Sequence, residues 1–220
     1  MLADPGGRRS EHERDPVRIV TRIAVLDYGS GNLHSVARAL AHAGATPVVT
    51  SEADVVAKTD ALVIPGVGHF GHCVRAIRSL GLDRAIAYAV ENGTAVFGVC
   101  VGMQVLFEGS EEDPEEGLGV LPGRSRRLSD EVTVPHIGWN EVTWRGSHPF
   151  VDGIADGTRF YFVHSYAPDA DGDAIGVTEH GRRFAAAAAR ENVFATQFHP
   201  EKSGRAGLAI YENFVKAVVG

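Results

Sequence analysis

The hydrophobic pattern divides the chain into a first half of alternating strands and helices and a second half rich in strands. Residues 19–26 form an apolar run with several β-branched side chains, which predicts a buried first strand. The elements expected after it are a helix at 33–43, strands at 46–50 and 61–64, a helix at 83–91 and a strand at 94–99. Strands that alternate with helices are typical of βαβ units and a largely parallel sheet.

The second half predicts mostly strands. The expected strands lie within 120–144, 159–167, 174–178, 184–189 and 193–198, and a helix is expected at 207–218. The alanine run within 184–189 is equally compatible with a helix. Residues 108–119 are acidic and contain glycine, so we expect a solvated loop there. The fold class is therefore α/β, with a central, largely parallel but mixed sheet flanked by helices in three layers.

Composition argues against several classes of function but does not identify one. Residues 1–20 offer little to bury and are predicted to be a disordered leader, so that 21–220 form a single domain. The net charge of −7 argues against a general role on nucleic acid or on an anionic membrane. No segment predicts a membrane span or a signal peptide, and two cysteines do not make a disulfide framework. A reducing cytoplasm fits these features.

A candidate nucleophile follows the strand predicted at 94–99. In a nucleophile elbow the chain leaves a strand, turns sharply and enters a helix, and small residues must flank the strained nucleophile. Gly98 and Gly102 flank Cys100 at that spacing, and 101–107 has an apolar spacing suited to a helix. A helix N-terminus favours a thiolate, and the N–H of Val101 is the expected half of an oxyanion hole.

The partners for such a thiol are found near residue 200. His199 can activate the thiol, and Glu201 can hold the imidazole in the required tautomer. Taken singly, a cysteine between glycines is more often structural, and a histidine beside a proline is commonly just a loop residue. Taken together, Cys100, His199 and Glu201 predict a cysteine hydrolase. The ten histidines do not fall into ligand spacings, so neither a metal nor a cofactor is expected.

Several longer segments carry a family resemblance. From about residue 22 onward the chain resembles the class I (triad) glutamine amidotransferases, and most of all the glutaminase subunits of imidazole glycerol phosphate synthase. The segments that carry it are 27–33, 65–68, 98–104, 135–140, 161–166 and 197–203. Met103, where related amidotransferases typically have histidine, and the segment Pro-His-Ile-Gly-Trp-Asn at 135–140 favour this subfamily.

The resemblance implies a role for each matching position. Cys100 would form a γ-glutamyl thioester, with His199 as general base and then general acid and Glu201 orienting it. The oxyanion hole would combine the N–H of Val101 with one from the loop of Val67 and Gly68, and family members are thought to need a peptide flip at that valine. The positions that match the family's glutamine site are Gly68, Gln104, Ser165 and Tyr166.

The resemblance also implies a partner. Family members pass ammonia to a (βα)₈-barrel cyclase subunit in a heterodimer, which makes imidazole glycerol phosphate and aminoimidazole carboxamide ribonucleotide in a lyase reaction of histidine biosynthesis. The positions that match the subunit interface are Asn32, Pro135, Trp139, Tyr161 and Lys202. Trp139 alone would more often be a core residue, and the motif favours the interface instead. The resemblance further implies a low basal rate that rises when the cyclase binds its nucleotide.

Other functions are compatible with parts of the pattern. An amidotransferase subunit of another synthase, or a γ-glutamyl peptidase, would share the nucleophile but is disfavoured by Met103 and 135–140. A binding subunit without activity would have no physical reason to retain Cys100, His199 and Glu201. The glycine-containing turn at 27–32 lacks the Gly-x-Gly-x-x-Gly spacing of a nucleotide-binding loop, because His34 stands where the third glycine would be.

Overall fold

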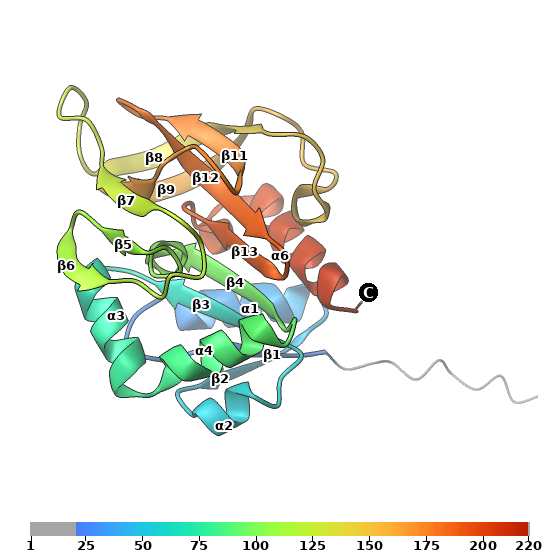
Figure 1. The fold of residues 1–220 in the computed structure, drawn as a ribbon. Helices are drawn as coiled ribbons and strands as arrows, with labels where there is room; N and C mark the ends of the chain where they lie inside the picture. The colour runs from blue at the N-terminus through green and yellow to red at the C-terminus, as the bar shows by residue number, and fades with distance from the viewer. Residues whose placement is uncertain (1–20, 220) are drawn as a thin grey trace, which may run out of the picture.

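A computed structural model describes residues 21–219, and the leader expected at 1–20 lies outside them. Its centre is a nine-stranded sheet in the order β2-β1-β3-β4-β13-β12-β11-β8-β9, with helices on both sides (Figure 1). The expectation of a three-layer α/β fold with a mixed sheet is confirmed. Within residues 21–219, no helix is both long enough and apolar enough to cross a bilayer.

One half of the sheet is parallel and nearly without polar residues. It contains β1 (Arg22–Leu26), β2 (Thr46–Thr50), β3 (Ala61–Gly66), β4 (Ala95–Cys100) and β13 (Val193–Thr196). β3 and β13 are buried along their whole length, as expected of parallel strands covered on both faces. Because β13 pairs with β4 directly, a segment near residue 195 lies beside one near residue 98.

The other half of the sheet is antiparallel. It contains β12 (Arg183–Arg190), β11 (Ala174–Glu179), β8 (His136–Trp144) and β9 (Thr158–His164). The alanine run that was compatible with strand or helix is the centre of strand β12, where buried alanines let β11 and β13 pack closely. In β8 the exposed residues include Ile137 and Trp139, so this strand presents an apolar surface.

The helices cover both faces of the sheet. They are α1 (Leu33–His42), α2 (Ala53–Val56), α3 (Phe70–Ser79), α4 (Leu82–Glu91), α5 (Val101–Gln104) and α6 (Gly204–Val219), with 3₁₀ turns η1 (Pro149–Val151) and η2 (Pro200–Lys202). α1 and α6 lie together on one face, and α3 and α4 lie on the other (Figure 1). Phe97 of β4 packs against Phe150, Tyr211 and Phe214 in the core.

A second sheet corrects the expected solvated loop at 108–119. It has four strands in the order β10 (Tyr166–Pro168), β7 (Arg124–Arg127), β5 (Gly109–Ser110) and β6 (Asp113–Glu116). The acidic side chains are used structurally: Glu112 accepts the N–H of Phe70 at 2.8 Å, and Glu115 pairs with Arg75 and Arg78 of α3. The loop prediction was wrong because these partners lie far away in sequence.

Two helical expectations also change. The helix expected at 101–107 ends at Gln104, and its continuation forms turns. The structure has α2 and α3, which are not among the expected elements. The predictions of α1, β2 and α4 are confirmed to within one residue at each end. These agreements follow from strong periodicity and from Gly93, which ends α4 with a positive φ of 76°.

Candidate active site

Cys100 stands in a strained turn between β4 and α5. Its φ of 57° and ψ of −113° lie in a region that side chains other than glycine rarely adopt. A Cβ on Gly98 would lie 2.6 Å from the carbonyl oxygen of Gly102, and one on Gly102 would lie 1.7 Å from that of Ile64. The flanking glycines are therefore required by backbone contacts, as in a nucleophile elbow.

His199 and Glu201 reach the thiol from the end of the neighbouring strand. In the parallel pair, Thr196 of β13 lies opposite Val99 of β4, so the chain leaves β13 beside Cys100. His199 Nδ1 lies 2.8 Å from Glu201 Oε1, and both side chains are almost fully buried. His199 Nε2 is also buried and has no hydrogen-bond partner among the residues the structure describes. The pair is thus preorganised, with one ring nitrogen still open.

The electrostatics of this cluster favour a charged imidazole. Burial alone would lower the pKa of His199, but the neighbouring Cys100 and the hydrogen-bonded Glu201 carboxylate together raise that pKa to about 10. An imidazolium between a thiol and a carboxylate supplies a proton donor at neutral pH and a counter-ion for a thiolate. Cysteine hydrolases need both of these properties.

Two buried glutamines lie close to Cys100. Gln104 Nε2 donates to the carbonyl oxygen of Tyr166 at 2.8 Å and to Gln197 Oε1 at 3.0 Å. Gln197 Nε2 in turn lies 3.8 Å from Cys100 Sγ. The structure therefore links Gln104 and Tyr166 to Cys100 through Gln197. Ser165, the residue before Tyr166, has its carbonyl oxygen occupied by the N–H of Leu128 at 2.9 Å.

The loop of Val67 and Gly68 is held in one position by the β1–α1 turn. Ser30 Oγ accepts the N–H of Val67 at 3.1 Å and donates to its carbonyl oxygen at 2.6 Å. The Val67 N–H, an expected oxyanion donor, is therefore occupied by Ser30 in this structure. Gly68 has a φ of 87° with nothing near its Cβ position, so its backbone conformation rather than contact requires glycine there.

The five residues expected at the subunit interface differ in how exposed they are. Trp139 is 51% exposed and meets Tyr161 edge-on, and the Lys202 ammonium lies 5.9 Å from the centre of the Tyr161 ring. Pro135 is exposed as well. Asn32 is different, because its Nδ2 lies 3.5 Å from Glu201 Oε1 and so contacts the buried acid. Among the expected interface residues, Asn32 thus contacts the buried carboxylate beside His199.

Sequence reasoning gave no role to three neighbours of the site, although each lies in a segment that carries the family resemblance. Gln197 belongs to the segment 197–203, and Ser30 belongs to the turn at 27–33. Tyr28 is buried and donates from its hydroxyl to the carbonyl oxygen of Pro65 at 2.5 Å, which fixes the start of the Val67 loop. The contacts that these side chains make became visible only in the fold.

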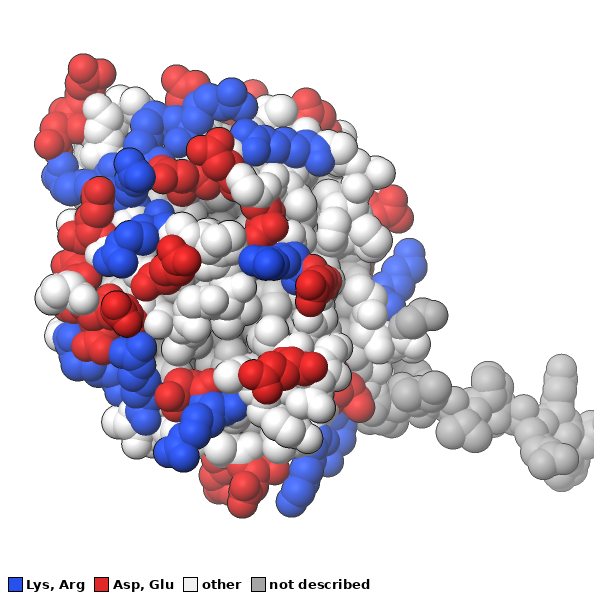
Figure 2. All heavy atoms as spheres, in the orientation of Figure 1, with Lys and Arg blue, Asp and Glu red and all other residues white. Residues whose placement is uncertain are grey.

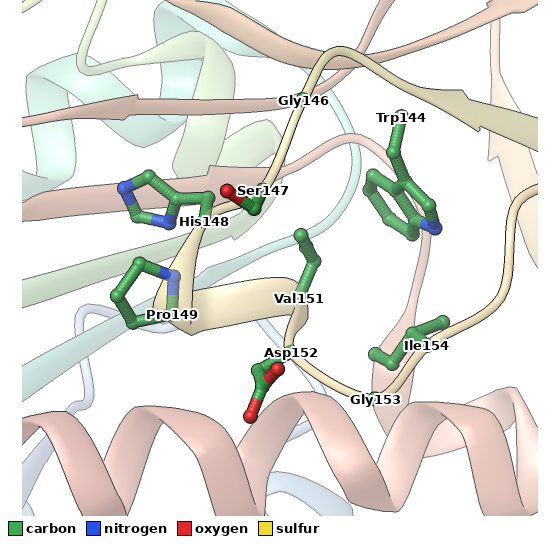
Figure 3. Close-up of a pocket in the computed structure, with 9 residues that line it drawn as sticks. All are labelled: Trp144, Gly146, Ser147, His148, Pro149, Val151, Asp152, Gly153 and Ile154. Atoms are coloured by element: carbon green, nitrogen blue, oxygen red, sulfur yellow. The ribbon is translucent and has the colours of Figure 1, made fainter.

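Two further surface features lie outside this cluster. A pocket of about 480 Å³ is formed by the β8–β9 connection, where Trp144, His148 and Ile154 surround it (Figure 3), and none of the expected site residues lines it. On the face seen in Figure 2 acidic and basic side chains are interspersed. The ion pairs of the structure include Arg78 with Glu115 and Arg126 with Asp169. That face carries no extended field of one sign.

Comparisons with known proteins place this geometry in context. The family model described as "Glutamine amidotransferase class-I" matches residues 24–218. The imidazole glycerol phosphate synthase subunit HisH of Dehalococcoides mccartyi is 45% identical over 201 residues, covering 90% of this chain and 98% of that protein. The subunit of the same name from Acinetobacter baylyi is 45% identical over 203 residues, with the same coverage of 90% and 98%.

Solved structures show the same fold at lower identity. A crystal structure of a glutamine amidotransferase has a TM-score of 0.72 at 20% identity, covering 90% of this chain and 99% of that one. The PurLQS structure from Thermotoga maritima has a TM-score of 0.70, also at 20% identity and with coverage of 90% and 99%. At this level of identity the likeness concerns the fold.

Proposed function

The chain belongs to the class-I glutamine amidotransferase family, and on that premise we propose that it is the glutaminase subunit of imidazole glycerol phosphate synthase. It hydrolyses the side-chain amide of glutamine to glutamate and ammonia. The observation that carries the proposal is the strained Cys100 at the end of β4, set beside the buried pair of His199 and Glu201 at the end of β13.

The first half of the reaction forms a thioester. The Cys100 thiolate attacks the amide carbon of glutamine, and the tetrahedral intermediate carries its negative charge on oxygen. The His199 imidazolium then gives its proton to the departing nitrogen, so that the carbon–nitrogen bond breaks and ammonia leaves. Glu201 holds the ring through Nδ1, which leaves Nε2 for the proton transfer.

The second half returns the enzyme to its starting state. His199, now neutral, takes a proton from a water molecule that attacks the thioester carbon. The carbon–sulfur bond breaks, glutamate leaves, and the imidazolium again faces the Cys100 thiolate. No cofactor is needed, because every step is an acyl or proton transfer between groups that the chain itself supplies.

The oxyanion is expected to be bound by backbone N–H groups of Val101 and of the loop at Val67 and Gly68. Ser30 occupies the Val67 N–H in the structure, so the loop must reorient before that group can face the substrate. This hydrogen bond supports a low basal glutaminase rate that rises when the partner binds its nucleotide. Gly66 and Gly68 are the residues that can absorb the change in backbone conformation.

The ammonia acceptor is proposed to be a (βα)₈-barrel cyclase that binds the face of Trp139, Tyr161 and Lys202, with Pro135 at its edge and Asn32 behind it. The exposure of Trp139 and of Ile137 supports this docking face, since aromatic and aliphatic anchors dominate interfaces. The heterodimer would carry out the lyase reaction, with ammonia passing through the interface rather than through water. Two free thiols, Cys73 and Cys100, support a reducing cytoplasm as its compartment.

The decisive experiment measures glutamate release from glutamine by the purified chain, alone and with the cyclase and its nucleotide. Strong stimulation only in the complete mixture is expected. Rapid glutamate release by the chain alone would agree with Cys100 as nucleophile but would contradict a subunit whose activity depends on its partner. It would favour a γ-glutamyl peptidase or another amidotransferase. If the complex forms but releases no glutamate, the proposed catalytic role is contradicted altogether.

A further inference from the structure

Two buried histidines outside the proposed catalytic cluster lie next to Tyr166, one of the residues expected to bind glutamine. His136, at the start of β8, and His164, at the end of β9, are opposite each other in the antiparallel pair. They are only 5% and 6% exposed, and His136 Nδ1 lies 3.2 Å from His164 Nε2. Neither takes part in the proposed hydrolysis. A hydrogen-bonded pair of buried imidazoles is costly to form, because each ring must be desolvated and matched to its neighbour.

A carbonyl oxygen fixes the direction of the hydrogen bonds. His164 Nδ1 lies 2.9 Å from the carbonyl oxygen of Tyr166, which can only accept, so Nδ1 carries the proton. His164 Nε2 then accepts from His136 Nδ1–H. His136 Nε2 is left as an acceptor for Asn140 Nδ2 at 3.4 Å. Every donor along this line meets an acceptor only if both rings are neutral.

The same carbonyl oxygen joins this line to the catalytic cluster. Tyr166 O also accepts from Gln104 Nε2, and Gln104 reaches Gln197 and through it Cys100 Sγ. A continuous polar chain therefore runs from Asn140 on β8, within the segment that carries Trp139, to the nucleophile. Its neutral state is consistent with burial, which lowers the pKa of His136 to about 4 and that of His164 to about 3.

Metal binding and simple aromatic packing account for the two histidines less well. His180 stacks on His136 with ring centres 4.1 Å apart, but within residues 21–219 no group of three His, Cys, Asp or Glu side chains could hold a metal ion. Aromatic packing alone, against Phe162 and Phe184, would not require two rings with matched donors and acceptors. The polar matching points to a role in placing the Tyr166 backbone.

We propose that His136 and His164 are positioning residues for glutamine, holding Tyr166 and Gln104 in the geometry that receives the substrate beside Cys100. The proposal rests on the proposed glutaminase activity. It assigns these histidines to substrate placement and not to chemistry. Their loss should therefore weaken glutamine recognition much more than it weakens the intrinsic reactivity of the thiol.

The test compares two alkylating reagents that share one target atom. Iodoacetamide needs only a reactive Cys100 thiol, whereas the glutamine-shaped reagent 6-diazo-5-oxo-L-norleucine also needs a formed glutamine pocket. The rates of labelling at Cys100 are measured on the full chain in complex with the cyclase. The KM and kcat for glutamine are measured on the same complex. The variants are His164→Phe and His136→Phe, which keep a ring but lose both polar atoms. His180→Phe is the matched control, because His180 belongs to the stack but not to the chain that ends at Tyr166.

For His164→Phe we expect the rate of labelling by the glutamine-shaped reagent to fall roughly tenfold, with a similar rise in KM. A factor of roughly ten is what the loss of one buried hydrogen bond is expected to cause. Iodoacetamide labelling should stay within about twofold of the parent rate. His164→Asn keeps a donor near the Nδ1 position and should restore most of the loss. If His164→Phe does not fold, His136→Phe carries the same comparison, because it removes the donor to His164 Nε2.

Equal slowing of both reagents, or no change in either, would overturn the proposal in favour of a purely structural role. A parallel loss in His180→Phe would also overturn it. If the parent chain reacts with iodoacetamide but never with the glutamine-shaped reagent, the proposed glutaminase activity itself fails, and the two failures are thereby distinguished.

Discussion

The backbone N–H of His199 donates a hydrogen bond of 2.9 Å to the carbonyl oxygen of Tyr161. Tyr161 belongs to β9 and, with Trp139, to the proposed docking face. Ser203 closes this contact, because its Oγ accepts the N–H of Tyr161 at 3.0 Å and donates to the carbonyl oxygen of His199 at 2.7 Å. The docking face is therefore bonded to the backbone of the proposed base.

Ser203→Ala should reduce both stability and rate. Loss of two buried hydrogen bonds is expected to lower the free energy of unfolding by about 1–3 kcal/mol and to lower kcat severalfold, because the backbone of His199 is released. Denaturant unfolding and glutamate release measure the two effects. Ser79→Ala, at an exposed serine of α3, is the control and should change neither. An unchanged kcat would show that the contact does not position the imidazole.

Cys100→Ser should separate glutamine hydrolysis from the rest of the complex. We expect glutamate release to fall by about 10³-fold or more, since a hydroxyl is a much weaker nucleophile than a thiolate at neutral pH. Binding to the cyclase and synthesis from added ammonia should remain. A pull-down with the cyclase and an ammonia-driven assay test this. Loss of all three activities would mean that Cys100 is structural.

Glu201→Gln should move the alkaline limit of the reaction. The pKa of His199 is raised to about 10, so the imidazolium is present at neutral pH and is lost only as the pH rises through about 10. Without the carboxylate that pKa falls, the alkaline decline in kcat/KM begins at lower pH, and the rate drops by roughly 10²-fold. Glutamate release from pH 6 to pH 10.5 tests this, with Glu141→Gln on exposed β8 as control. The same alkaline limb in both proteins would contradict it.

Ser30→Ala should release the Val67 loop. The Ser30 hydroxyl holds both backbone groups of Val67, and without it the loop can reorient at lower cost. We expect the basal glutaminase rate to rise about tenfold and stimulation by the nucleotide-bound cyclase to shrink by the same factor, as loss of about one hydrogen bond predicts. A fall in the stimulated rate with no rise in the basal rate would show that Ser30 supports the active loop instead.

The histidine pair should make stability depend on pH below neutrality. In the folded chain the pKa is about 4 for His136 and about 3 for His164, both below the ordinary value of 6.5. Below pH 6.5 these two histidines are therefore protonated in the unfolded chain before they are protonated in the folded chain. Stability is therefore complete above pH 6.5 and is lost progressively as pH falls toward 4 and then 3. Melting temperatures between pH 7.5 and pH 4.5 should decline less in a His136→Phe, His164→Phe double variant.

The ionisable neighbours of the pair define the control for that measurement. His180 stacks on His136, and His180 and His199 both contribute to the lowered pKa of His164. His180→Phe should leave most of the pH dependence in place, because burial is the largest cause of both shifts. An identical pH profile in the double variant and in the parent chain would contradict a buried, neutral pair.

The elements that could be predicted from sequence are those whose signal is local. The elbow at Cys100 needs only small residues at fixed distances along the chain, and α1 and α4 have regular apolar spacing. The strand β12 remained ambiguous because alanine fits a helix as well as a crowded strand. Only its neighbours β11 and β13 decide which one forms.

What could not be predicted depends on contacts between distant segments. The acidic stretch forms strands because Arg75 and Arg78 of α3 and the N–H of Phe70 meet it. Likewise, local composition does not predict the hydrogen bonds of Ser30 with Val67 or the hydrogen bond of His164 with Tyr166. Motif spacing pointed to Cys100 as the proposed nucleophile and to His199 and Glu201 as the proposed acid–base pair, while the groups that hold them became visible only in the fold.

The pairing of β4 with β13 has a consequence during synthesis. The ribosome makes the elbow at Cys100 well before it makes β13, and the strands β5 to β12 must emerge in between. A growing chain therefore carries a thiol with no imidazole beside it and cannot hydrolyse glutamine. The pairing of β13 with β4 is what sets His199 beside Cys100, so hydrolysis has to wait until nearly the whole chain has been made.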